Sequence, residues 1–213
     1  VVTIRNFYKY VLKQELSLDD IPYPRPTNYL PVVLSVQEVA RLINAPANIK
    51  HRAILQLMYS CGLRVSEPGE IIIQKGNCHI DGDRKTLLVK GAKGYKDRYV
   101  PIPIPTIVLL RNYMIDWKPS TYLFAGQFPG EKYSKRTIQI IFKKALRKAG
   151  INKPATPHSL RHSRLTHLCE AGMDIYKIKE FAGHNNIKTT ELYLHLSKTS
   201  LVNHTEFADR IIA

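Results

Sequence analysis

Four prolines within eleven residues constrain the fold of this chain more than any other feature of its sequence. The segment IPYPRPTNYLP, residues 21–31, has proline at positions 22, 24, 26 and 31. Proline lacks a backbone N–H donor and restricts the residue before it, so a helix or a central strand is not expected to cross such a segment. We therefore predict a semi-rigid linker over residues 21–31, between a segment at 1–20 and a domain at 32–213.

The segment before the linker has the pattern of one amphipathic helix. Over residues 3–18, Ile4, Phe7, Tyr8 and Val11 recur at helical spacing. A single helix cannot bury such a face by itself. We therefore expect residues 1–20 to be the C-terminal end of a preceding domain whose remaining part is missing.

The segment after the linker is predicted to fold as an α+β domain that is mostly α-helical. Ser35 and Glu38 have the spacing of a capping box and predict a helix start. Between residues 71 and 104 the pattern changes to short β-rich runs separated by DGDR and GAKGYK, which predicts a small antiparallel β-sheet. Further helices are predicted at 49–60, 106–116, 134–149, 157–171, 174–182 and 189–197.

The charge of the chain favours a polyanionic partner. Its 213 residues include 32 Lys and Arg against 17 Asp and Glu, a net charge of +15. Nucleic acid is the expected partner, and a membrane is the weaker alternative because no apolar run approaches the length of a membrane span. Three widely spaced cysteines without a CxxC motif predict reduced thiols in a cytoplasmic protein.

A group of four polar side chains near the C-terminus suits chemistry on a phosphodiester. His158, Arg161, His184 and Tyr193 follow one another at gaps of 3, 23 and 9 residues. His158 and Arg161 share one face at a helix N-terminus, where free amides and the helix dipole attract phosphate. Arginine binds phosphate oxygens through a planar fork, and a tyrosine with a lowered ionisation cost is a plausible nucleophile.

Simpler explanations apply to the neighbouring histidines. His158 and His162 stand four residues apart, as zinc ligands can, but the HExxH glutamate is absent and no third ligand is evident, so no metal site is predicted. His162 is expected to pack behind the site, and His167 to be a partly buried surface residue.

With two further motifs upstream, the pattern resembles the tyrosine recombinase (phage integrase) family. The carrying segments are CGLRVSE at 61–67, VKGAKGYKDRYVP at 89–101, HSLRH at 158–162, Gly183-His184, and the tyrosine nine residues later. The resemblance covers residues 32–200 and implies the fold of DNA breaking-rejoining enzymes. It also implies that residues 1–20 belong to the helical core-binding domain of such an enzyme.

The resemblance implies a site-specific recombinase that cleaves DNA through a 3′-phosphotyrosine, without metal, ATP or another cofactor. Tyr193 would attack the scissile phosphate, and Lys93 would protonate the 5′ leaving oxygen. His158 would assist as a base or positioning group. The expected phosphate ligands are Arg64, Arg161 and His184.

The chain departs from the family pattern at one place, and three rival functions remain open. Pro68-Gly69 stands where relatives usually continue with apolar helix residues, and it suits a turn better than a helix. The first rival, a type IB topoisomerase, usually has lysine in place of His158. The second is a non-catalytic DNA-binding relative. The third is a basic structural or RNA-binding protein, for which no aromatic-stacking motif is evident.

Several basic residues are expected to contact the DNA backbone. They are Lys96 and Arg98 in the hairpin, together with Lys132, Lys135, Arg136 and Lys143 at the basic helix predicted over 134–149. The partner implied by the resemblance is double-stranded DNA, bound by a homotetramer that holds two recombining sites with a dimer on each. The C-terminal tail, LVNHTEFADRIIA, is expected to be exchanged between protomers.

Overall fold

The computed structural model describes residues 2–14, 31–91, 97–128 and 130–196 of a chain that divides into two compact units, Val1–Leu30 and Pro31–Ala213. In the first unit, helix α1 spans Val2–Phe7 and continues as the π-helix η1, Tyr8–Leu12. Lys13 has a left-handed conformation, with φ of 50°. The helix predicted over 3–18 therefore stops at Leu12, and the predicted linker lies outside the described residues except for Pro31.

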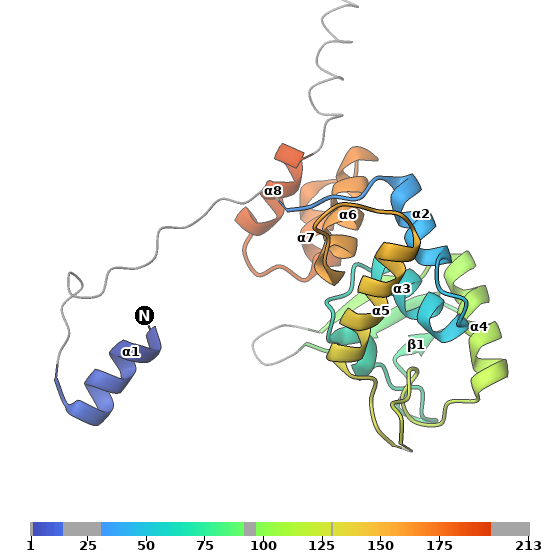
Figure 1. Cartoon of the computed structure of the whole chain (residues 1–213), viewed down its shortest axis with the longest axis horizontal. Helices are drawn as coiled ribbons and strands as arrows, with labels where there is room; N and C mark the ends of the chain where they lie inside the picture. The colour runs from blue at the N-terminus through green and yellow to red at the C-terminus, as the bar shows by residue number, and fades with distance from the viewer. Residues whose placement is uncertain (1, 15–30, 92–96, 129, 197–213) are drawn as a thin grey trace, which may run out of the picture. The chain divides into compact units, whose positions relative to one another are not determined.

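The second unit is a mostly helical domain with a small antiparallel sheet, which confirms the predicted fold class (Figure 1). Its strands are β1 (Ile80–Asp81), β2 (Thr86–Val89) and β3 (Arg98–Pro101). Its helices are α2 (Val36–Asn44), α3 (Ile49–Ser60), the 3-10 helix η2 (Glu67–Glu70), α4 (Ile104–Trp117), α5 (Lys135–Lys148), α6 (Pro157–Glu170), α7 (Ile175–Ala182) and α8 (Lys188–Leu196).

Helix α2 begins at the predicted capping box. The Ser35 amide donates to Glu38 Oε2 at 2.7 Å, and the Glu38 amide donates to Ser35 Oγ at 3.2 Å. Just before this cap, the buried Leu34 amide donates to Ser163 Oγ on α6 at 2.8 Å. The chain entering the domain is therefore fixed to the helix that carries the predicted HSLRH motif.

The sheet is smaller than the pattern of the sequence suggested. Its strands are ordered β1-β2-β3, and β2 pairs with β3 in a register that places Leu87 opposite Val100 and Val89 opposite Arg98. These four residues are buried, so Arg98 lies on the sheet face that packs against the core. The IIIQ run at 71–74 contributes only an isolated bridge from Ile72 to Tyr122 rather than a strand.

Helices α3 and α6 form the centre of the domain. Helix α3 buries Ala53, Ile54, Leu57 and Met58. Helix α6 packs against α3, α5, α7 and α8, and α7 packs against β3. This packing brings the segment after α3, the first turn of α6, the end of α7 and helix α8 together, with α6, α7 and α8 grouped in Figure 1.

Candidate active site

Five of the six residues predicted to be catalytic line one cavity. The cavity has a volume of about 380 Å³. The sixth, Lys93, and the predicted DNA contact Lys96 lie outside the described residues. The cavity is lined by Arg64, His158, Arg161, His162, Gly183, His184, Asn185, Asn186, Thr189 and Tyr193.

The first turn of α6 positions His158 and Arg161. Pro157 is the first helical residue, and the Thr156 amide donates to Ser159 Oγ at 3.0 Å, which closes the helix N-terminus. His158 is exposed at the cavity, whereas Arg161, one turn later, has only 4% of its surface exposed. The pKa of His158 lies below its ordinary value because of partial burial and the charge of Arg161, so its imidazole is neutral at pH 7.

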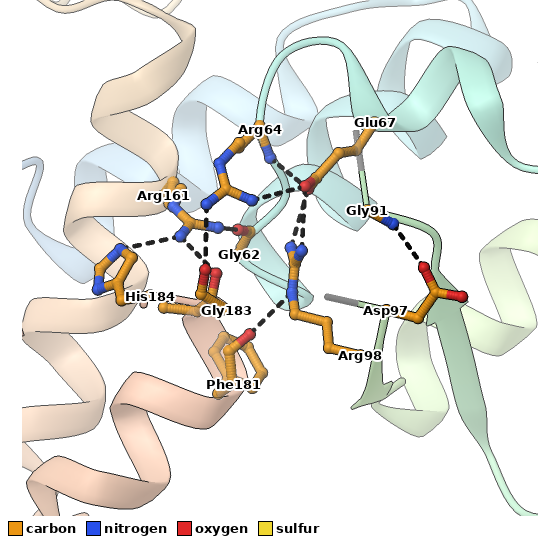
Figure 2. Close-up of polar contacts among 11 residues, drawn as sticks. Gly62, Arg64, Glu67, Gly91, Asp97, Arg98, Arg161, Phe181, Gly183 and His184 are labelled. Carbon is orange, nitrogen blue, oxygen red and sulfur yellow. Dashed lines mark hydrogen bonds and ion pairs between the residues drawn. The ribbon is translucent and has the colours of Figure 1, made fainter. Parts of the chain in front are cut away.

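Arg161 is anchored by backbone carbonyls from two other segments (Figure 2). Its Nη1 donates to the Gly62 carbonyl and its Nη2 to the Ala182 carbonyl, each at 2.6 Å. Its Nη2 also lies 3.0 Å from His184 Nε2. Burial and the nearby charge of Arg64 lower the pKa of Arg161 to about 10, which still leaves the guanidinium charged at pH 7.

His184 is a neutral imidazole whose tautomer is defined by its neighbours. A guanidinium only donates, so His184 Nε2 accepts from Arg161. The proton therefore lies on Nδ1, which donates to Thr190 Oγ1 at 2.9 Å. Burial and the charge of Arg161 hold the pKa of His184 at about 4.

Gly183 shapes the backbone that presents His184. It caps α7 in the left-handed conformation, with φ of 64°. A Cβ atom at this position would lie 2.9 Å from Arg98 Cδ. Both the backbone angle and the close approach therefore require glycine, as the Gly-His pair in the sequence suggested.

Glu67 joins two arginines at the edge of the cavity (Figure 2). Its Oε1 accepts from Arg64 Nη1 and Arg98 Nη1, both at 3.0 Å, and its Oε2 accepts from Arg98 Nη2 at 2.9 Å. Arg64 Nη2 reaches the Gly183 carbonyl at 3.3 Å. Burial alone would raise the pKa of the Glu67 carboxyl, but the hydrogen bonds and charges of the two arginines outweigh it and hold that pKa below its usual value.

The location of Arg98 differs from the predicted contact with the DNA backbone. Its side chain is only 5% exposed, and its Nε donates to the Phe181 carbonyl at 3.1 Å. The reason is the register of β3, which directs this residue to the buried sheet face, where Glu67 supplies the opposite charge. Arg98 therefore braces Glu67 and the end of α7 and is not available at the surface for DNA.

Pro68 and Gly69 lie in the short 3-10 helix η2 instead of a simple turn. Proline suits the first turn of a helix, and both residues are buried. A Cβ atom on Gly69 would collide with the Tyr133 carbonyl, so the glycine permits a close approach of two backbone segments. This departure from the family pattern leaves Glu67 in contact with Arg64.

Tyr193 is a buried residue of the cavity lining and contacts two imidazoles. It is 2% exposed, and its hydroxyl lies 2.9 Å from His162 Nδ1. The His184 ring stacks on its ring with centroids 6.3 Å apart and an angle of 11° between the planes. Burial raises the pKa of the Tyr193 phenol, an effect that Arg161 partly opposes, so the phenol keeps its proton at pH 7.

Sequence reasoning missed part of the cavity lining. Asn185, Asn186 and Thr189 line the cavity, and the fully buried Thr190 orients His184. The GHNN segment at 183–186 and its short distance in sequence from α8 were the signals that could have identified these residues. His162, expected to pack behind the site, contacts the hydroxyl of Tyr193 directly.

The basic residues predicted on α5 are at the surface. The helix buries Ile138, Ile141, Phe142 and Ala145 and leaves Lys135, Arg136 and Lys143 exposed. Lys132, which precedes the helix, forms an exposed ion pair with Glu70 at 2.6 Å.

The described part of the chain offers neither a metal centre nor a membrane span. No group of three or more His, Cys, Asp or Glu residues in these ranges could hold a metal ion. None of the described helices is both long and apolar enough to cross a membrane.

Comparison with known proteins assigns the chain to a family. The model of the phage integrase family matches residues 33–200. The chain is 35% identical to the putative integrase/recombinase y4eF of Sinorhizobium fredii, covering 91% of this chain and 76% of that protein. It is 34% identical to tyrosine recombinase XerD of Staphylococcus epidermidis, covering 99% and 75%. The crystal structure of XerA recombinase matches with a TM-score of 0.73 at 30% identity, covering 97% of this chain and 73% of that one. The chain therefore belongs to the phage integrase family, the tyrosine-type site-specific DNA recombinases.

Proposed function

We propose that this recombinase cleaves and rejoins double-stranded DNA through a covalent 3′-phosphotyrosine link at Tyr193. The observation that carries the proposal is one cavity whose lining includes Tyr193, two arginines and three imidazoles. Tyr193 Oη attacks the phosphorus, the bond from phosphorus to the 5′ oxygen breaks, and a 5′ hydroxyl reverses the step. The covalent link conserves the bond energy, so rejoining needs neither ATP nor a metal ion.

The charges around the cavity support phosphate binding. Glu67 binds Arg64 and Arg98, and Arg161 is a third guanidinium near the same carboxylate, so the site has an excess of positive charge. We assign Arg64 and Arg161 to the non-bridging oxygens, where they neutralise charge in the transition state. His184 joins them after its Nε2 gains a proton, because a bound phosphate raises the pKa of the imidazole.

The remaining catalytic roles follow the family pattern. His158 is exposed at the cavity and assists the bound phosphate, as a positioning group or a base. Lys93 protonates the 5′ oxygen. The base of its hairpin is closed by the bond from the Gly91 amide to Asp97 Oδ1, 2.8 Å long, and is held near the site by Arg98.

The assembly that we propose on DNA is a homotetramer with a dimer on each recombining site. The net charge of +15 and the basic face of α5 support DNA as the partner. The tail, residues 201–213, is proposed to be exchanged between protomers and lies outside the described residues. We also propose a cytoplasmic location, which fits a DNA substrate and the reduced thiols expected from the sequence.

A metal-free cleavage assay tests the proposed chemistry. A duplex that the protein binds is first selected from a random-sequence pool; it is called the selected duplex below. Copies with one 5′-bridging phosphorothiolate at each successive phosphate are then incubated with the protein in EDTA. We expect a covalent adduct on a denaturing gel at one position per strand, and mass spectrometry should locate the DNA on Tyr193. An adduct on another residue, or none on any copy, would contradict the proposal.

An exchange assay distinguishes recombination from topoisomerase activity. Two copies of the selected duplex of different length should exchange arms and give products of new lengths. A type IB topoisomerase would relax a supercoiled plasmid without such products.

The salt dependence of binding tests the DNA surface on α5. Affinity should fall linearly on a log–log plot against salt, and each phosphate contact contributes about −0.9 to the slope. Replacing both Arg136 and Lys143 with alanine should make the slope shallower by about 2. Arg111→Ala, on the exposed side of α4, should leave the slope unchanged. An unaltered slope in the double variant would remove α5 from the interface.

A further inference from the structure

One contact in the cavity has no part in the catalytic roles assigned above. The Tyr193 hydroxyl, which is the reacting atom of the proposed function, lies 2.9 Å from Nδ1 of His162 on α6. The two ring centroids are 5.9 Å apart, and His184 stacks on Tyr193 as well. His162 therefore lies within hydrogen-bond distance of the nucleophile and does more than pack against it.

The protonation states decide the direction of this hydrogen bond. Burial, His158 and Arg161 lower the pKa of His162 to about 4, so its ring is neutral at pH 7 and one of its nitrogens is an acceptor. The Tyr193 phenol has a raised pKa and keeps its proton. A neutral phenol donates a hydrogen bond better than it accepts one, and an unprotonated imidazole nitrogen accepts well. The favoured arrangement has Tyr193 Oη–H donating to His162 Nδ1.

We propose that His162 is a catalytic residue of this enzyme and accepts the phenol proton of Tyr193 during attack, which leaves the positioning role to His158. The proposal rests on the proposed function. As the bond from Oη to phosphorus forms, the proton moves to His162 Nδ1. The bond from phosphorus to the 5′ oxygen breaks, and that oxygen takes its proton from a separate acid. The same imidazolium returns its proton to Tyr193 when the strands rejoin.

The transfer must accompany attack, because a neutral phenol is a far weaker acid than an imidazolium. When Oη bonds to phosphorus, its proton becomes much more acidic and moves to the imidazole. The groups that face His162 are Tyr193 on α8, His184 at the end of α7, and His158 and Arg161 on its own helix. A phosphate bound beside them adds negative charge, which stabilises the imidazolium.

A substitution that keeps the hydrogen bond but not the basicity tests the proposal. In His162→Asn, the side-chain oxygen can occupy the place of Nδ1 and accept from Tyr193, but it cannot take up a proton. The reactive phosphorothiolate copy of the selected duplex is the substrate, because its thiolate leaving group needs no acid. We expect adduct formation at pH 7 to slow by about 10²- to 10⁴-fold, the usual contribution of a general base. The rate difference between wild type and His162→Asn should shrink as the pH rises toward 9, because hydroxide replaces the missing base.

The same helix supplies a matched control. His167, also on α6, is half-buried and makes a bond of the same kind, from Nδ1 to the Tyr59 hydroxyl at 2.9 Å, away from the cavity lining. His167→Asn should therefore cleave at the wild-type rate. His162→Gln provides a second variant if the first is unstable by thermal melting.

The outcomes separate this inference from the proposed function. A wild-type adduct at Tyr193, together with cleavage by His162→Asn at the wild-type rate, would leave the proposed function intact and overturn the role of His162. A slow rate with the same deficit at every pH would overturn the proton transfer and indicate a structural effect. Failure of the wild-type protein to form any adduct would overturn both.

Discussion

Replacing Tyr193 with phenylalanine should abolish covalent attachment to the selected duplex. The substitution removes one oxygen atom and leaves the ring that packs against His184. Without the nucleophile, the rate of adduct formation should fall by at least about 10⁴-fold. Because the Tyr193 residue is only 2% exposed, loss of its hydroxyl should change the affinity for DNA by less than about twofold, since phosphate contacts dominate that affinity.

Two measurements make the Tyr193→Phe result specific. A denaturing gel measures the adduct, and a binding assay on the uncleaved selected duplex measures affinity. The free energy of unfolding should fall by about 1 kcal/mol, the usual net effect of one lost hydrogen bond. Persistence of the adduct would show that another residue is the nucleophile, and a large loss of affinity would show that the hydroxyl contacts DNA in the uncleaved complex.

Replacing Glu67 with alanine should destabilise the domain by about 3–5 kcal/mol, because the change leaves buried arginine charge without its partner. The Glu67 carboxylate is 11% exposed and forms an ion pair with the guanidinium of Arg98, which is itself 5% exposed. Arg98 also donates a hydrogen bond to the Phe181 carbonyl, so the loss of stability should extend from η2 to the end of α7. Urea denaturation monitored by circular dichroism measures the difference.

Glu70 is a matched control in the same 3-10 helix. It pairs with Lys132 at 2.6 Å, but the two side chains are 52% and 56% exposed. Glu70→Ala should therefore change the stability by less than about 1 kcal/mol. Equal losses in the two variants would show that the helix η2, and not the buried ion pair, is the source of the effect.

The stability difference between wild type and Glu67→Ala should depend on pH. The pKa of Glu67 is lower in the folded protein than its ordinary value of 4.5. The carboxylate therefore contributes fully above about pH 4.5, and the contribution is lost as the pH falls through the folded pKa. The difference should be constant from about pH 5 to about pH 8 and should narrow below about 4.5.

Local signals in the sequence predicted the helices of the domain well. The capping box at Ser35 and Glu38 locates the start of α2, and the apolar spacing of Ile138, Ile141 and Phe142 locates α5. Such features depend on residues three or four apart, which one segment determines by itself. The prediction of a strand at 71–74 was wrong, because strand pairing there depends on a distant segment around Tyr122.

The residues of the candidate site were predicted from the sequence, but the contacts that support them were not. Family motifs marked Arg64, Arg161, His184 and Tyr193, and the fold gathers them at one cavity. Arg98 looked like a surface cation because the sequence of one hairpin does not reveal a carboxylate 31 residues away. The bond from His162 to Tyr193 likewise joins two helices whose packing no local pattern determines.

The attachment of β3 to the site has a consequence for how such enzymes diversify. The anchors of the β2–β3 hairpin are at its base: the strand register, the Gly91 to Asp97 bond, and the grip of Arg98 on Glu67 and Phe181. Residues between Gly91 and Asp97 can therefore change in length or be exchanged with those of a relative without releasing these anchors. Changes confined to positions 92–96 should therefore leave the base of the hairpin intact, and a lysine is kept at position 93 because of the role that we propose for it.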